Sequence, residues 1–153
     1  MLSKVLLIIS LILLASLATY SVSEQQIPAH GRAERPSPSD WIKEDQIKVY
    51  PNRVILTLRN STWASFTDTN SMDPFLDAES NAIEIKPSTA ELINLGDIIA
   101  YESPQGVIIH RIIQKDTDEQ GIYFIVKGDN NPQPDEQKVR FADVKGVVVA
   151  IIY

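Results

Sequence analysis

The sequence contains no cysteine and only two histidines, His30 and His110. The absence of cysteine excludes disulfide bonds, thiolate nucleophiles and cysteine-ligated zinc sites. A metal site built from several histidines is excluded as well, so we expect neither a metal nor another cofactor. The net charge of −6 provides no excess of basic side chains, and we therefore expect no nucleic-acid partner.

The remaining composition is typical of a globular protein. Of the 153 residues, 44% are hydrophobic and 22% are charged, which are ordinary proportions for a folded chain. The length corresponds to one domain with accessory segments.

The first accessory segment is an uncharged apolar run over residues 5–23, directly after Lys4. As a helix, the run reaches roughly 28 Å, just enough to cross the hydrocarbon core of a bilayer. Lys4 favours a cytoplasmic N-terminus. We therefore predict a single-pass membrane anchor over residues 1–23, with the rest of the chain on the extracytoplasmic or lumenal side. A cleavable signal peptide is the less favoured alternative, since Ser16 and Ala18 form a small-residue cleavage motif.

Proline, glycine and serine interrupt residues 24–45, which we expect to form a linker that contains His30. Residues 46–153 carry strand-forming residues in short runs without a long helical period, so an all-β domain is predicted. Folded antiparallel sheets or a small barrel would satisfy this pattern. The predicted strands cover residues 47–50, 54–59, 62–66, 82–85, 97–102, 107–114, 122–127 and 144–152, and residues 88–93 are predicted to contain a helical turn.

Ser71 lies between polar turn-forming residues and Pro74. A predicted strand over residues 62–66 precedes it and Pro74 ends regular structure after it, so we expect the hydroxyl on a stiff segment at the end of a strand. A nucleophilic serine needs such a fixed, exposed oxygen. On its own, the pattern is more common in turns that have no catalytic function.

His110 lies within an otherwise apolar run, and the period of a strand places it on one face with Ile108 and Ile112. Arg111 lies on the other face. A histidine in this position is either a core residue with one satisfied hydrogen bond or a general base that accepts a proton near neutral pH.

The loop after the predicted strand over residues 122–127 is rich in glycine, asparagine and proline, which indicates a tight turn. It contains two carboxylates, Asp129 and Asp135. Either both are solvated, or one of them accepts the Nδ1 proton of His110 and stabilises the imidazolium ion.

Several short segments, taken in order, resemble the sequence boxes of type I signal peptidases. They are Ser71-Met72-Asp73-Pro74, Gly96-Asp97-Ile98-Ile99, Ile109-His110-Arg111, Lys127-Gly128-Asp129-Asn130-Asn131 followed by Asp135, and Gly146-Val147-Val148. A His-Arg pair in place of Lys-Arg is similar to the archaeal and endoplasmic-reticulum branch, which uses a Ser-His-Asp set. The resemblance extends over about residues 64–150, nearly the whole predicted domain.

The resemblance implies the β-sheet fold of that family and a role for each matched residue. Ser71 would be the nucleophile and His110 its general base. Asp135 or Asp129 would orient His110, and the resemblance does not separate the two. The backbone N–H of Ser71 and the hydroxyl of Thr69 would bind the oxyanion.

Other positions near the matched segments have structural roles or depart from the family. Asp97 and Arg111 carry opposite charges, and we predict a salt bridge between them. Asn70 replaces the usual small residue before the nucleophile, and it would have to accept left-handed backbone there. The segment over residues 75–95 is longer than in the family, which affects the expected shape of the cleft.

The implied activity is a cofactor-free serine endopeptidase that removes signal peptides from secreted preproteins. Its partners would be preprotein signal sequences, with small side chains at the minus-three and minus-one positions, and membrane lipid; some relatives also act with further subunits. Two alternatives stay open. One is a catalytically inactive, membrane-tethered β-domain that binds a partner, and the other is a serine autoprotease related to phage repressors, which would use a lysine base.

Overall fold

Strands make up most of the regular structure in the computed structural model, which describes residues 35–153. The helices among these residues are single 3-10 turns, and none is long and apolar enough to cross a membrane. The predicted membrane anchor over residues 1–23 lies outside the described residues, as does the first part of the predicted linker.

The prediction of a mostly β domain with antiparallel sheets is confirmed. The strands are β1 (Ile47–Tyr50), β2 (Arg53–Leu56), β3 (Ser61–Ser65), β4 (Asn81–Ile85), β5 (Ile98–Ser103), β6 (Gly106–Asp118), β7 (Gly121–Lys127), β8 (Val139–Arg140) and β9 (Val144–Ile152). The helical turns are η1 (Glu44–Gln46), η2 (Ala90–Leu92) and η3 (Phe141–Asp143). Every predicted strand has a counterpart here, whereas β8 was not predicted.

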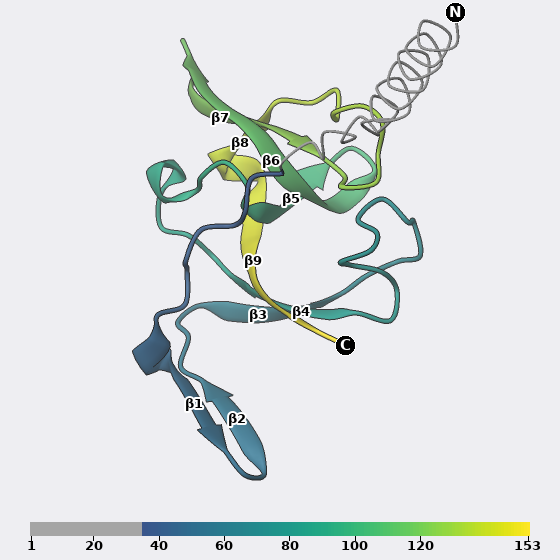
Figure 1. Cartoon of the computed structure of the whole chain (residues 1–153). Coiled ribbons are helices and arrows are strands. Elements are labelled where there is room, and N and C mark those ends of the chain that lie inside the picture. Colours follow the sequence, from purple (N-terminus) through teal and green to yellow (C-terminus); the bar gives the residue numbers. More distant parts are fainter. Residues whose placement is uncertain (1–34) are drawn as a thin grey trace, which may run out of the picture. The chain divides into compact units, whose positions relative to one another are not determined.

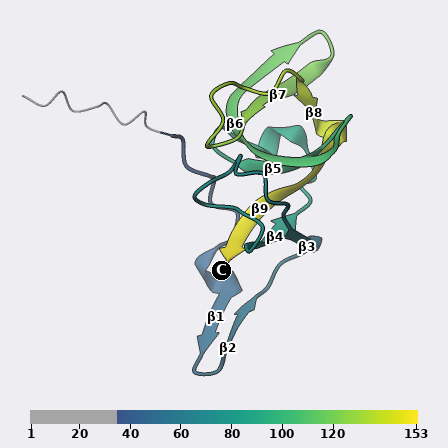
Figure 2. The ribbon, with the colours of Figure 1, turned by 90° about the vertical axis from the view of Figure 1, so that its right-hand side faces the viewer.

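β9 connects two parts of the larger sheet. That sheet has seven strands in the order β3-β4-β9-β5-β6-β7-β8, and β1 and β2 form a separate hairpin. In Figure 1, β9 passes from the β3–β4 pair to the strands around β5, and the β1–β2 hairpin extends away from the larger sheet in both Figures 1 and 2. Register shifts interrupt the β4–β9, β5–β9 and β6–β7 ladders, and such bulges bend and twist a sheet.

Alternating side chains give the sheet two packed faces. Ile98 and Ile99 are neighbours on β5, yet Ile99 belongs to a large buried cluster with Phe124, and Ile98 belongs to a smaller one. The smaller cluster also contains Met72 and Leu76. One face of the sheet therefore packs against the segment that carries Ser71.

Part of the predicted linker contacts the domain. The backbone amide of Ser39 donates a hydrogen bond of 2.6 Å to the Asp97 carboxylate, and Trp41 packs against the larger cluster. Residues 35–45 are thus held on the sheet, and the described unit begins at Arg35.

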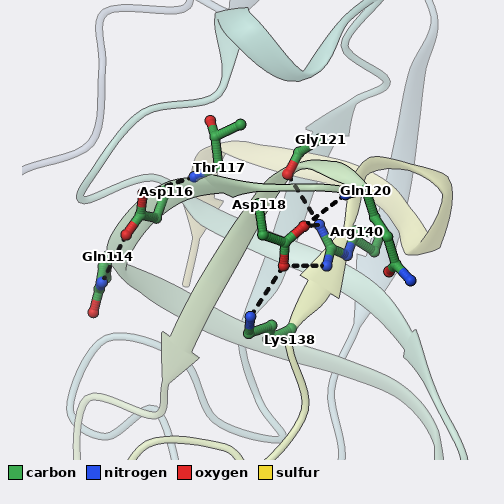
Figure 3. Close-up of polar contacts among 8 residues, drawn as sticks. All are labelled: Gln114, Asp116, Thr117, Asp118, Gln120, Gly121, Lys138 and Arg140. Carbon is green, nitrogen blue, oxygen red and sulfur yellow. Dashed lines mark hydrogen bonds and ion pairs between the residues drawn. The ribbon is translucent and has the colours of Figure 1, made fainter.

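Asp118 fixes the turn between β6 and β7 to β8 (Figure 3). Its carboxylate accepts hydrogen bonds of 2.7 Å from Nη2 of Arg140 and 3.0 Å from Nζ of Lys138. These two bonds, with the larger effect from Arg140, hold the pKa of the Asp118 carboxyl well below its usual range. The ionised carboxylate explains how a strand of only two residues keeps its place at the sheet edge.

Candidate active site

Ser71 lies in a turn rather than at the end of a strand. β3 ends at Ser65, and the polar residues that follow separate it from Ser71. Ser71 begins a turn that contains Pro74 and is closed by hydrogen bonds to the Met72 carbonyl. Asn70 has φ of 55°, so the expected left-handed backbone before the serine is confirmed.

The loop after β7 fixes the backbone of Ser71. The Asn130 amide donates to the Ser71 carbonyl at 2.9 Å, and the Asn130 side chain donates to the Asn70 carbonyl at 3.0 Å. Gly128 permits this close approach, because a Cβ atom there would lie 2.6 Å from the Ser71 carbonyl oxygen. The position of the serine therefore depends on a loop almost sixty residues further along the chain.

The Ser71 hydroxyl lies beside the hydroxyl of Thr69. The two Oγ atoms are 3.1 Å apart, and either one can donate. No hydrogen bond joins Ser71 to His110 among the described residues, and catalytic hydrogen bonds of unliganded enzymes often close only when substrate binds. Thr69 thus places a second hydroxyl group directly beside that of Ser71.

His110 is buried on β6 and pairs with Asp135. The Nδ1 atom of the imidazole lies 2.6 Å from Oδ2 of Asp135, and His110 is 6% exposed. Because an ionised carboxylate only accepts hydrogen bonds, this contact assigns the proton to Nδ1 and leaves Nε2 as the basic nitrogen. Of the two candidate carboxylates, the structure brings Asp135 to His110.

Tyr101 of β5 holds the same carboxylate. Its hydroxyl donates to Oδ2 of Asp135, and the Asp135 amide donates to the Val126 carbonyl at 2.9 Å. Burial, and then the hydrogen bond and negative charge of Asp135, raise the pKa of the Tyr101 phenol well above its ordinary value. Tyr101 therefore stays protonated and orients Asp135.

Asp129 pairs with Arg111 instead of His110. Nε and Nη2 of Arg111 donate to its two carboxylate oxygens at 2.8 and 2.7 Å, and both side chains are buried. Nη1 of Arg111 donates to the Gly96 carbonyl at 2.9 Å. Because the Asp129 amide also contacts the sulfur of Met72 at 3.4 Å, this ion pair supports the loop that fixes the serine.

The predicted salt bridge between Asp97 and Arg111 is wrong. Asp97 is fully buried, and its carboxylate accepts hydrogen bonds from the backbone amides of Ser39 and Asn94 at 2.6 and 2.8 Å. The two backbone amides satisfy the Asp97 carboxylate. The loop after β7 brings Asp129 to the Arg111 guanidinium instead. Asp97 therefore holds the segment before β5 and lies outside the chemistry of the site.

Ser71 and His110 line one cleft. The cavity has a volume of about 470 Å³, and Phe66, Leu76 and Ile109 form part of its apolar lining. Its size suits a few residues of an extended peptide rather than a whole folded partner. Thr69, Ser71 and His110 thus line one open, largely apolar groove, and Asp135 contacts His110 from outside its lining.

Sequence reasoning missed Tyr101 and Gly128 as functional positions. Tyr101 lay in a predicted strand, but its contact with Asp135 depends on how the later loop folds back. Gly128 lay in a matched segment, and its role follows only from the distance between two chain segments. A third missed residue, Glu84, had a visible signal: strand alternation places this acid on the same face as the apolar Ala82.

No family model matches the sequence. A 50-residue stretch is 40% identical to an uncharacterized protein of Methanocaldococcus jannaschii, and the match covers 33% of this chain. The matched stretch spans about 25% of the length of that curated relative. This similarity relates a part of the chain to an archaeal protein and assigns no activity to it.

Proposed function

We propose that the protein is a membrane-anchored serine endopeptidase of the signal peptidase type, which removes signal peptides from secreted preproteins. The observation that carries the proposal is the 2.6 Å contact between Nδ1 of His110 and Asp135, beside the cleft that Ser71 also lines. The anchor over residues 1–23 would keep this cleft near the membrane, where signal sequences end.

The proposed chemistry begins with a proton transfer. Nε2 of His110 takes the Ser71 proton as Oγ attacks the scissile carbonyl, and Asp135 stabilises the resulting imidazolium ion. His110 then gives this proton to the leaving amine as the tetrahedral intermediate collapses and the scissile C–N bond breaks, which leaves an acyl ester on Ser71. Water, activated by the same imidazole, hydrolyses this ester and regenerates the serine.

Two groups would donate to the oxyanion. The backbone N–H of Ser71 and the Thr69 hydroxyl would both face the tetrahedral intermediate, and Thr69 is already 3.1 Å from the attacking oxygen. Removing one oxyanion donor typically lowers the rate by about 10²–10³. Gly128 and Asn130 add to this arrangement by fixing the carbonyl of Ser71.

A lysine-dependent autoprotease is a weaker candidate. Lys145 also lines the cleft, but its ammonium lies 2.5 Å from the Glu102 carboxylate. The Lys145 ammonium is therefore engaged by Glu102, and no hydrogen bond joins it to Ser71 among the described residues. The His110–Asp135 pair is therefore the better base.

The decisive experiment compares the detergent-solubilised full chain with its Ser71→Ala variant on a model preprotein. We expect the wild type to cleave once, after a small residue, and the variant to be folded and inactive. Ser61→Ala, on an exposed position of β3, is the matched control and should cleave normally. Sequencing the new amino terminus identifies the bond. Normal cleavage by Ser71→Ala would rule out the proposed nucleophile.

A further inference from the structure

Glu84 is a buried acid in the candidate cleft that the proposed chemistry does not use. It lies on β4 and is 5% exposed, and it lines the cleft together with Ser71 and His110. Its Oε1 atom is buried without a hydrogen-bond partner. A buried polar atom without a partner destabilises a fold, so this carboxyl group has no structural justification.

The surroundings of Glu84 are shaped to hold the side chain in this place. A Cβ atom on Gly146 of β9 would lie 2.9 Å from both Cβ and Oε2 of Glu84, so the glycine provides the space for the carboxyl group. Ala100 of the neighbouring strand β5 also lines the cleft. Gly146 thus lets the Glu84 carboxyl group pack against β9, and the Glu84 side chain lines the groove together with Ala100.

The chemical state of Glu84 limits what it can bind. Burial raises the pKa of its carboxyl group above the ordinary value, which favours the neutral acid. A carboxyl group accepts hydrogen bonds, and its protonated form also donates one, so a hydroxyl group complements it in either form. An apolar side chain of the ligand would leave Oε1 of Glu84 unpaired. A cationic side chain of the ligand would be repelled by the ammonium group of Lys145, which also lines the cleft.

We propose that Glu84 is a specificity-determining residue, which selects a serine or threonine side chain at the minus-three or minus-one position of the substrate. Alternate side chains of an extended peptide point to the same side, so these two positions can reach the cleft together. The identity of the ligand as a peptide rests on the proposed function, whereas the preference for a hydroxyl group follows from Glu84 itself.

The test uses peptide pairs that differ only by threonine or valine, which have nearly the same shape, at each of the two positions. We expect wild-type kcat/KM to favour threonine by about tenfold at one position, the effect of one hydrogen bond. Glu84→Met should remove the preference, and Glu84→Gln, which keeps a donor and an acceptor, should retain it. Glu79→Met changes an exposed acid outside the cleft lining and should leave the preference unchanged.

A binding experiment separates this inference from the proposed function. The Ser71→Ala variant is titrated with the same peptides, with and without Glu84→Met, and thermal unfolding verifies that each variant is folded. Threonine-selective binding without wild-type cleavage would support the role of Glu84 and contradict the peptidase. Cleavage without threonine preference, a preference for lysine, or no binding at all would overturn the role of Glu84.

Discussion

Asp129 binds one edge of the Arg111 guanidinium through both of its oxygens, at 2.8 and 2.7 Å, with both residues buried. The acidic loop therefore contains one carboxylate in a buried ion pair and one that contacts His110, the proposed base. Asp135, six positions later, contacts His110. This division predicts that substitution of Asp129 mainly lowers stability, whereas substitution of Asp135 mainly lowers activity.

Asp129→Ala should destabilise the domain strongly. Removing one partner of a buried ion pair leaves the other charge uncompensated and costs about 3–5 kcal/mol. Denaturant unfolding of the variant measures this loss, with the exposed Asp68→Ala as a control near wild type. The double variant Asp129→Leu/Arg111→Met should recover part of the stability, and failure to recover any of it would contradict the ion-pair explanation.

Asp135→Asn should abolish most of the activity while leaving the fold intact. The amide no longer fixes the Nδ1 proton or stabilises the imidazolium ion, and a loss of kcat on the order of 10³–10⁴ is expected. Preprotein cleavage and thermal unfolding are measured on the same sample. Near-normal cleavage by this variant would remove Asp135 from the mechanism.

Gly128→Ala should inactivate the enzyme without touching a catalytic side chain. The added Cβ would lie 2.6 Å from the Ser71 carbonyl oxygen and 2.7 Å from Nδ2 of Asn131. Because the first contact is with backbone, the serine must move, and we expect at least about a 100-fold loss of activity. Gly128→Ala/Asn131→Ala relieves only the side-chain contact, so recovery of activity in this double variant would contradict the prediction.

Tyr101→Phe tests the phenol that holds Asp135. The pKa of Tyr101 is raised in the folded protein, so its contribution to stability is complete below the ordinary tyrosine pKa of about 10 and is lost as the pH rises through the folded value. The melting temperature of the wild type should therefore fall more steeply than that of Tyr101→Phe above about pH 10. Parallel curves for the two proteins across this range would count against a protonated Tyr101.

Local sequence patterns were sufficient for the strands because β-branched residues and turn formers mark both their interiors and their ends. Ile112 belongs to the larger buried cluster and Ile108 packs against it, whereas Ile109 packs against the smaller cluster. The alternation around His110 predicted this separation. β8 escaped prediction because two residues, Val139 and Arg140, are too short a run to show a period.

The contacts of the site depend on loops, and loops are poorly specified by local patterns. Opposite charge near the matched segments suggested a pair between Asp97 and Arg111, yet backbone amides satisfy Asp97. Sequence alone could not distinguish Asp129 from Asp135, because their partners are set by how residues after β7 fold back over β5 and β6. Strand alternation places the acid Glu84 on a buried face, but its unpaired Oε1 atom becomes apparent only in the folded structure.

The central place of β9 has a consequence for biosynthesis. Among the described strands it is the last to leave the ribosome, yet both β4 and β5 pair with it. Until Gly146 and its neighbours emerge, Glu84 has no partner strand on that side, and β4 and β5 lack the strand that joins them. The proposed site would therefore assemble only after β9 has been synthesised, late in the synthesis of the described domain.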